Sequence, residues 1–364
     1  AGVSLSGLAQ TYNGAARVAT ATTVPPGLTV DITYDGSATA PSEVGSYAVV
    51  ATINDAMYLG STSGTLVVSA PSATVTLDSL AQDYDGTPKS VTATTEPAGL
   101  AVDFTYNGSA TAPTAAGSYA VTGTINDVNY DGFATGTLVI AKAEATVLFD
   151  SLGAIYDGTG KMATVSTEPA GLAVDLTYNG SAALPVAVGS YAVTGIVADA
   201  NYEGANSAVF VISKGAATVS LTGLAQAYDG TPKNASATTA PSGLTVDFTY
   251  NGSGTAPTAA GSYLVTGLVN DANYAGLSTG TLVIAKAAAT VSLGGLSQVY
   301  DGAAKTVTVS TAPTGLAVTV TYDGSVSAPI ETGQYAVVAT ILDANYEGAA
   351  TGTLTIAAEG QDPF

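Results

Sequence analysis

Three residue types are missing from this sequence, which contains no cysteine, no histidine and no tryptophan. Without cysteine there are no disulfide bonds and no thiol nucleophile, and without histidine there is no Ser-His-Asp triad and no Cys/His zinc site. The usual general base near neutral pH is also absent. These absences exclude most hydrolytic mechanisms, and we predict that the chain is not an enzyme and uses no cofactor.

Charge is scarce as well. Only 10% of the 364 residues are charged, against roughly 25% in a typical soluble domain, and 28 acidic residues against 8 basic ones give a formal net charge of −20. An acidic chain repels nucleic acid and anionic lipid. Gly, Thr, Ser or Asp interrupts every apolar run before the roughly 18–20 residues of a membrane span. We therefore expect neither nucleic-acid binding nor membrane insertion.

What the sequence has in abundance is repetition with a period of 72 residues. All 20 tyrosines fall on four ladders of this period, and the first ladder precedes an Asp-Gly or Asn-Gly pair. The tyrosines of the first ladder are Tyr12, Tyr84, Tyr156, Tyr228 and Tyr300. The glycines two residues later are Gly14, Gly86, Gly158, Gly230 and Gly302. We interpret each pair as a turn and its aromatic anchor, because glycine admits the unusual φ of tight turns.

The period divides the chain into five tandem repeats without insertions. The predicted repeats are residues 1–72, 73–144, 145–216, 217–288 and 289–359, and residues 360–364 leave the register as a tail or as the start of a further segment. Further glycines that recur from Gly45 and Gly60 are read as turn residues too. A chain that repeats its turns and its aromatic residues repeats a fold.

Residues 73–144 show the pattern expected within one repeat. Alternating or Thr-rich segments predict strands over 74–80, 90–95, 100–106, 117–125 and 137–141. No segment has a sustained helical period with caps. The fold class is therefore all-β, with five or six short strands per repeat. Linkers of about three residues, without flexible tracts, predict that the repeats form an elongated rod.

The repeated motifs resemble the mostly-beta-grasp (MBG) repeats of bacterial surface adhesins. The pattern runs Y-[DN]-G-T-P-K, P-x-G-L, T-Y-[ND]-G-S, A-G-S-Y-x-V, D-x-N-Y-x-G and T-G-T-L-x-I-x-K-A, and it covers residues 1–359. The first copy departs at Asn13 and Arg17, and the fifth at Gln334. The resemblance implies a β-grasp-like or immunoglobulin-like module used in tandem as an extracellular stalk, and it implies no catalytic residues.

One recurrent acidic position is a candidate calcium ligand, because carboxylate and amide oxygens clustered in a loop suit that ion. Its five members are Asp55, Asp127, Asp199, Asp271 and Asp343. The alternative is an Asx turn, in which the carboxylate accepts hydrogen bonds from nearby backbone N–H groups. The nearest acidic neighbour varies between repeats, and Leu59 and Ala275 stand at its position in two of them. This variation favours the turn.

Three other recurrent features also have simpler readings. Asn-Gly-Ser at 107–109, 179–181 and 251–253 matches a glycosylation acceptor, but Asp35 and Asp323 replace the asparagine elsewhere, as a tight turn allows. Lys89 and its equivalents could form an isopeptide bond, although a solvated cation beside the turn is the simpler interpretation. The Thr-rich strand at 92–95 could present hydroxyl groups to a ligand, but β-branched residues suit any exposed strand.

These observations favour a structural role over chemistry. The leading hypothesis is a stalk or spacer at a bacterial cell surface, which holds a binding tip of unknown ligand away from the cell. Five globules of 72 residues, each about 30 Å across, would reach ~150–200 Å end to end. The alternatives are a self-assembling extracellular filament subunit and a repeat module that itself binds glycan or matrix ligands. The expected partners are neighbouring repeats and other copies of the chain.

Overall fold

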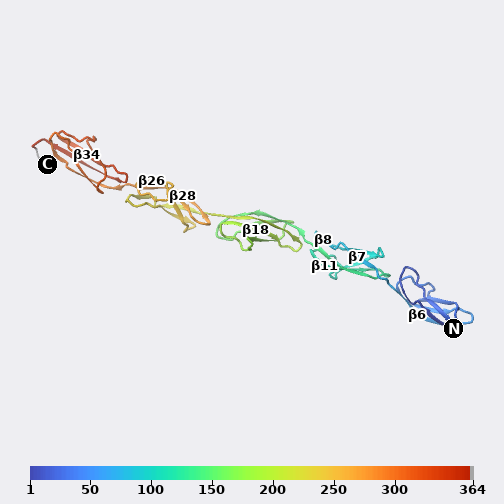
Figure 1. The fold of residues 1–364 in the computed structure, drawn as a ribbon. Coiled ribbons are helices and arrows are strands. Elements are labelled where there is room, and N and C mark those ends of the chain that lie inside the picture. Colours follow the sequence, from blue (N-terminus) through green and yellow to red (C-terminus); the bar gives the residue numbers. More distant parts are fainter. Residues whose placement is uncertain (361–364) are drawn as a thin grey trace. The chain divides into compact units, whose positions relative to one another are not determined.

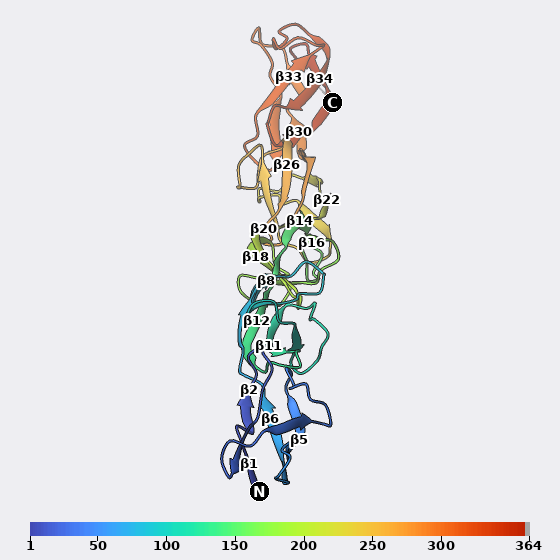
Figure 2. The same ribbon diagram turned by 90° about the vertical axis from the view of Figure 1, so that its right-hand side faces the viewer.

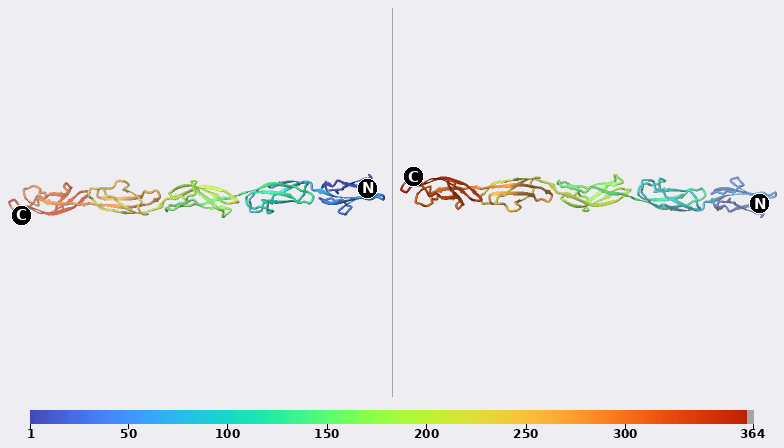
Figure 3. Two further views of the ribbon diagram at one scale, coloured as in Figure 1. Left: turned by 90° about the horizontal axis from the view of Figure 1, so that it is seen from below. Right: turned by 90° about the horizontal axis from the view of Figure 1, so that it is seen from above.

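The structure is a computed structural model and describes residues 1–360. Every regular element in this range is a β-strand, and Figure 1 shows strands joined by turns without a coiled ribbon. The turned views of Figure 2 and Figure 3 show the same. The predicted all-β class is confirmed. Of the predicted tail at 360–364, the part after Gly360 lies outside the described residues.

No helix in residues 1–360 is long and apolar enough to cross a membrane. By its internal contacts the chain divides into two compact units. The first consists of residues 1–151, 164–182 and 192–208, and the second of residues 152–163, 183–191 and 209 onward. The division passes through the third repeat. The junctions of repeats 1–2 and 2–3 therefore belong to the first unit, and those of repeats 3–4 and 4–5 to the second.

The strands recur in the same order in each stretch of 72 residues. The first repeat contains β1 (Gly2–Ser6), β2 (Ala9–Thr11), β3 (Thr20–Val24), β4 (Val30–Tyr34), β5 (Gly45–Ile53) and β6 (Ser61–Ser69). The second contains β7 (Thr74–Asp78), β8 (Ala81–Asp83), β9 (Thr92–Glu96), β10 (Val102–Tyr106), β11 (Gly117–Ile125), β12 (Phe133–Ala141) and β13 (Ala143–Glu144). The third contains β14 (Thr146–Ser151), β15 (Gly153–Ile155), β16 (Thr164–Glu168), β17 (Val174–Tyr178), β18 (Gly189–Val197), β19 (Tyr202–Glu203), β20 (Ala205–Ser213) and β21 (Gly215–Ala216).

The last two repeats continue the series. The fourth contains β22 (Thr218–Thr222), β23 (Ala225–Ala227), β24 (Ser236–Ala240), β25 (Val246–Tyr250), β26 (Gly261–Val269), β27 (Tyr274–Ala275), β28 (Leu277–Ala285) and β29 (Ala287–Ala288). The fifth contains β30 (Thr290–Gly294), β31 (Ser297–Val299), β32 (Thr308–Ala312), β33 (Val318–Tyr322), β34 (Gly333–Ile341), β35 (Tyr346–Glu347) and β36 (Ala349–Ala357).

Within the second repeat, all five predicted strands exist. The strand over 117–125 has the predicted bounds, and the other four have shifted ends. The strand predicted over 74–80 stops at Asp78, and a separate strand of three residues, β8, follows it. The last of the five predicted strands, β12, begins four residues earlier than predicted, at Phe133. The sequence reading missed β8 because three residues are too few to show a period of two. It missed the start of β12 because alanine and glycine weaken the pattern there.

Each repeat is built from two sheets. In the second repeat β7 pairs with β9, and a four-stranded sheet has the order β10-β11-β12-β8. Neighbours in this sheet are antiparallel except β12 and β8, which are parallel. The first, fourth and fifth repeats have the equivalent sheets, and Figure 2 labels β2, β5 and β6 in the first repeat. Because the two sheets bury their inner faces against one another, each repeat is a small β-sandwich.

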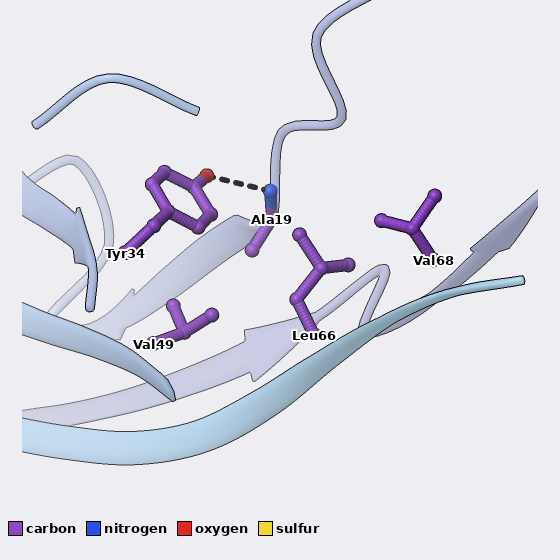
Figure 4. Packing of buried hydrophobic residues seen from close by; sticks show 5 residues of the cluster. All are labelled: Ala19, Tyr34, Val49, Leu66 and Val68. Carbon is purple, nitrogen blue, oxygen red and sulfur yellow. Dashed lines mark hydrogen bonds between the residues drawn. The ribbon is translucent and has the colours of Figure 1, made fainter. Parts of the chain in front are cut away.

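The core of the first repeat lies between these sheets (Figure 4). Tyr34, Val49 and Leu66 are at most 4% exposed, and they pack with Ala19 and Val68. The Tyr34 hydroxyl accepts a hydrogen bond of 2.8 Å from the backbone N–H of Ala19. A buried N–H without a partner is costly, so this hydroxyl ties the loop after β2 to the core. The bond recurs at Tyr106, Tyr250 and Tyr322.

Glycines of the Gly45 and Gly60 series are not turn residues, so that part of the sequence reading is wrong. Gly45 begins a strand, and Gly60 and its equivalents lie outside the left-handed region. The Gly14 series does have left-handed φ values, from +77° to +84°. Glycine is needed in the Gly60 series because another backbone segment lies close to it, as described below for the junction between repeats.

The core hydroxyl can be tested by replacing Tyr250 with phenylalanine. We expect Y250F to leave the buried N–H of Ala235 without its partner and to destabilise the fourth repeat by about 1–3 kcal/mol. The control is Y263F, whose hydroxyl donates to the exposed carbonyl of Ala259 and should matter by less than about 0.5 kcal/mol. Hydrogen exchange at Ala235 measures the difference. Equal exchange in both variants would refute the role of the Tyr250 hydroxyl.

Candidate functional site: the junction between repeats

The recurrent aspartate organises a loop that faces the preceding repeat. Asp199 Oδ1 accepts hydrogen bonds from the backbone N–H groups of Asn201 and Tyr202, at 2.7 and 3.0 Å. This is the geometry of an Asx turn. The same acceptor role falls to Asp55, Asp127, Asp271 and Asp343. Within residues 1–360 no three Asp, Glu, His or Cys side chains gather where they could hold a metal ion.

The linker between repeats pairs with this loop as a parallel β-bridge. β13, at the end of the second repeat, pairs with β19 of the third, and the backbone N–H of Ala145 donates to the carbonyl oxygen of Glu203 at 2.7 Å. β21 pairs with β27, and β29 with β35, in the same way at the next two junctions. The chain entering a repeat is therefore hydrogen-bonded to that repeat on both sides of the boundary and has little freedom as a linker.

A glycine makes this pairing possible. A Cβ atom on Gly204 would overlap the carbonyl oxygen of Ala145, which lies in the linker. Gly132, Gly276 and Gly348 stand in the same relation to the linkers of their repeats. Gly60 approaches the carbonyl of Ala1 similarly. The recurring glycine of the D-x-N-Y-x-G motif thus allows a close backbone contact. The motif alone does not distinguish a glycine with this role from a glycine in a turn.

The asparagine of the same motif reaches across the boundary. Asn201 Oδ1 accepts a hydrogen bond of 2.9 Å from the backbone N–H of Ala116, which belongs to the preceding repeat. The equivalent bonds join Asn129 to Val44, Asn273 to Val188 and Asn345 to Ala260. In the first repeat Met57 occupies this position, and its thioether cannot replace the amide as an acceptor of comparable strength.

Two tyrosine ladders meet at each junction. Tyr84 and Tyr202 lie edge to face with ring centroids 5.4 Å apart and an interplanar angle of 81°. The other pairs are Tyr12 with Tyr130, Tyr156 with Tyr274 and Tyr228 with Tyr346. A tyrosine of the first ladder thus contacts one of the fourth ladder in the next repeat. Such pairs contribute about 0.5–1.5 kcal/mol beyond the area they bury.

Lysines in three linkers complete the contact. Lys142 Nζ donates to the carbonyl oxygen of Asp199 at 2.6 Å, and Lys214 and Lys286 do the same for Asp271 and Asp343. The junction of repeats 1 and 2 lacks this bond, because Ala70 occupies the lysine position there. That junction has one isolated bridge, between Ser72 and Asp131, in place of a two-residue strand pair.

The Tyr-Asp-Gly element lies at the opposite end of each repeat from the Asx-turn loop. Asp85 Oδ1 accepts hydrogen bonds from the backbone N–H and the hydroxyl of Thr87, and Lys89 Nζ lies 2.6 Å from Asp85 Oδ2. The hydrogen bond from Lys89, then those from Thr87, hold the pKa of Asp85 well below its ordinary value. Asp157, Asp229 and Asp301 form the same pair with Lys161, Lys233 and Lys305.

These lysines are not solvated, which corrects the sequence reading. Their side chains are only 10–17% exposed, because the apolar stems pack over the turn while the ammonium groups meet the aspartates. The pairing also bears on the isopeptide alternative, since an ionised, exposed carboxylate is a poor acyl donor to an ammonium group. In the first repeat Asn13 and Arg17 replace the pair, and Arg17 instead donates to the carbonyl of Thr11.

The Asn-Gly-Ser sequences form turns. Asn107 has φ +47° and its Oδ1 accepts the backbone N–H of Ala120 at 2.8 Å, and Asp35 accepts that of Ala48 at the same distance. On the Thr-rich strand β9, Thr92 and Thr94 are exposed, whereas Thr95 Oγ1 accepts the backbone N–H of Leu100. Thr95 thus accepts a backbone N–H, whereas the exposed Thr92 shares a hydrogen bond of 3.3 Å with the Ser79 hydroxyl.

Sequence reasoning found the junction residues but not their connections. The four tyrosine ladders, the recurrent aspartate and its asparagine were all visible as a periodic pattern. The pairing of the linker with the loop was not, because two-residue strands have no periodicity. One signal of this pairing was available, the glycine at the end of D-x-N-Y-x-G. It stands directly before a long strand, where no turn requires a glycine, so its recurrence needs another explanation.

The junctions and the β-sandwich repeats define a tandem structural array, and the family model for the MBG domain identifies it. This model matches residues 1–72, 73–144, 145–216, 217–288 and 289–360. The chain belongs to the MBG domain family, which confirms the resemblance seen in its motifs. Membership supports a repeat-based structural role of the surface or adhesin type, and points to a non-catalytic module.

Solved structures with some likeness to the chain are also tandem arrays. Sidekick-1 immunoglobulin domains 1–5 cover 96% of this chain and 97% of their own, at 12% identity and a TM-score of 0.22. Domains 4–9 of the surface layer protein SbsC cover 98% of this chain and 82% of their own, at 12% identity and a TM-score of 0.23. Scores this low carry no argument about function. No curated protein matches the chain.

The Asp-Lys pairs predict a dependence of stability on pH. The lowered pKa keeps the folded carboxylates ionised at a pH where the unfolded chain, with an ordinary value of 3.8, takes up protons. The pairs therefore stabilise the fold above about pH 4, and this contribution is lost as the pH falls below it. Thermal unfolding from pH 7 to pH 2 should show a smaller loss in a chain with D85N, D157N, D229N and D301N. An unchanged acid profile would contradict this.

The close approach at the junction predicts the effect of a single methyl group. In G204A the new Cβ must displace the linker, so the hydrogen bond between Ala145 and Glu203 should be lost. Hydrogen exchange at Ala145 should rise about five- to thirtyfold, as expected for about 1–2 kcal/mol. The control is G153A in the same repeat, where a Cβ meets nothing within 4 Å. Similar exchange in both variants would show that the contact is dispensable.

Proposed function

We propose that the five MBG repeats form a stalk or spacer of an extracellular bacterial surface adhesin, which projects a binding tip located elsewhere. The observation that carries the proposal is the recurrence of one set of contacts between successive repeats. A paired linker, an asparagine bond and a tyrosine pair occur at the boundary of repeats 2 and 3 and again at the two that follow. A module with no need for fixed neighbours would not repeat them.

The energetics support ordered junctions. Each junction has a tyrosine pair of about 0.5–1.5 kcal/mol and several hydrogen bonds of about the same net value. These contacts need not offset the full entropy of association, because a linker of about three residues already holds the repeats at an effective concentration in the millimolar range or above. Contacts too weak to join two free domains therefore suffice to order two tethered ones.

The surface also suits a spacer. A net charge of −20 makes neighbouring copies repel one another, which keeps a crowded array of stalks apart. Repeats about 30 Å across, ordered end to end, would extend over ~150–200 Å. In this proposal the function of the repetition is to make the stalk long, and the five repeats need no ligand of their own.

Small-angle X-ray scattering of the chain over a concentration series, with calcium and then with EDTA, tests the proposal. We expect an elongated monomer of ~150–200 Å that is indifferent to EDTA. A compact or freely jointed particle would overturn the stalk. An EDTA-sensitive shape would instead restore the aspartate loops as calcium sites. A mass that grows with concentration would favour the filament subunit, and a monomer that binds a glycan or matrix array would favour the ligand-binding module.

The matched variant for this experiment removes the contacts of one junction. A chain with N201A and G204A should lose the bond to Ala116 and the linker pair, and should scatter as two segments joined by a hinge. The control replaces Asn126, whose amide bonds only Asp103 of its own repeat, in N126A. Equal maximum dimensions for the two variants would show that these junction contacts do not order the chain.

A further inference from the structure

The first and last parts of each repeat meet as parallel strands. In the second repeat β8 and β12 pair in the register Ala81 with Val139 and Asp83 with Ala141. The backbone N–H of Val139 donates to Leu80 at 2.8 Å, and that of Tyr84 donates to Ala141 at 2.9 Å. The same parallel pairs are β2 with β6, β15 with β20, β23 with β28 and β31 with β36.

Tension on the chain loads this pair in one particular direction. Force enters each repeat from the side of β8 that leads to its N-terminus, and it leaves through the C-terminal end of β12. Because the strands are parallel, the two pulls act in opposite senses along the same axis. The hydrogen bonds between parallel strands are evenly spaced and slanted, and they bridge the two strands along the whole pair. They are therefore strained together and must break together, whereas strands pulled apart from one end lose their bonds one at a time.

We propose that this parallel pair is a mechanical clamp that holds each repeat closed under tension. The inference rests on the proposed stalk, since only a stalk would be pulled at both ends. Resistance to a pulling force is governed by the unfolding rate, so a fold can have modest equilibrium stability and still resist tension. A small sandwich of 72 residues, with a limited core, gains most from such a device.

Side chains brace the short strand of the clamp. Gln82 Nε2 donates to the carbonyl oxygens of Ser79 and Ser90, both at 2.9 Å, and so ties β8 to the chain on either side of it. Gln10, Gln226 and Gln298 make the same two bonds in their repeats. The third repeat has Ala154 at this position, so its clamp lacks the brace. It is the natural control within the chain.

The absence of cysteine allows the clamp to be tested by choosing where the full chain is pulled. Two double variants share A141C, at the C-terminal end of β12, and differ in the second handle. A81C pulls β8 from its N-terminal end, which shears the pair. D83C pulls it from its C-terminal end, which peels the pair open. All three positions are exposed, and both variants are kept reduced before the handles are attached.

Single-molecule force spectroscopy should show a rupture force several-fold higher for the A81C/A141C chain than for the D83C/A141C chain. Their thermal midpoints should agree, so that direction alone accounts for the difference. Equal rupture forces would overturn the clamp. The result is separable from the stalk, because a chain that is compact in scattering but anisotropic under force would keep the clamp and lose the stalk, and the reverse outcome would lose only the clamp.

The role of the glutamine brace can be tested by measuring the unfolding forces of the single repeats with the same instrument. When the unmodified chain is pulled by its ends, one of five unfolding events should occur at a lower force than the rest, and A154Q should raise it to their level. The matched removal, Q82A, should create a second low-force event. A force distribution unchanged by both substitutions would show that the glutamine does not support the clamp.

Discussion

The junction depends on how closely the carbonyl oxygen of Ala145 approaches Gly204. Only glycine leaves room for a linker to lie against the loop and pair with it. Once the linker is paired, the Asx turn fixed by Asp199 presents Asn201 and Tyr202 to the preceding repeat. The side-chain contacts across the boundary therefore follow from a backbone contact inside one repeat, and a single methyl group should be enough to disturb all of them.

Each end of a repeat has a turn held by an aspartate carboxylate, but the two carboxylates have different partners. At one end the carboxylate of Asp199 bonds only backbone N–H groups, and the carbonyl oxygen of the same residue accepts Lys142. At the other end the carboxylate of Asp85 is shared between Thr87 and Lys89, whose ammonium group covers the charge. The chain has seven lysines, and all of them lie at these turns and linkers, where the ammonium group meets an oxygen that is already held in position.

Much of this arrangement could be predicted from the sequence, because it is periodic. The ladders beginning at Tyr12 and Tyr34 revealed the repeats, the alternating segments indicated the all-β class, and the ordered motifs indicated the family. What the sequence could not reveal was which recurrent residues contact one another. Gly60 looks like Gly14 in a pattern, although one permits a close approach and the other a left-handed turn. Lys89 looks like any surface lysine until its stem is seen to be buried.

Tyr84 connects the core of its repeat to the next repeat. Its backbone N–H closes the parallel pair with Ala141, its ring packs against the core, and the same ring meets Tyr202 of the next repeat. Unfolding one repeat would withdraw this ring from its neighbour, and losing the neighbour would expose a ring that the core only partly covers. The stability of each repeat is therefore coupled to the next, as nearest-neighbour terms couple the units of other repeat proteins. Such coupling adds an interface term to the stability of each repeat, while the parallel strand pair inside each repeat sets the force at which that repeat opens.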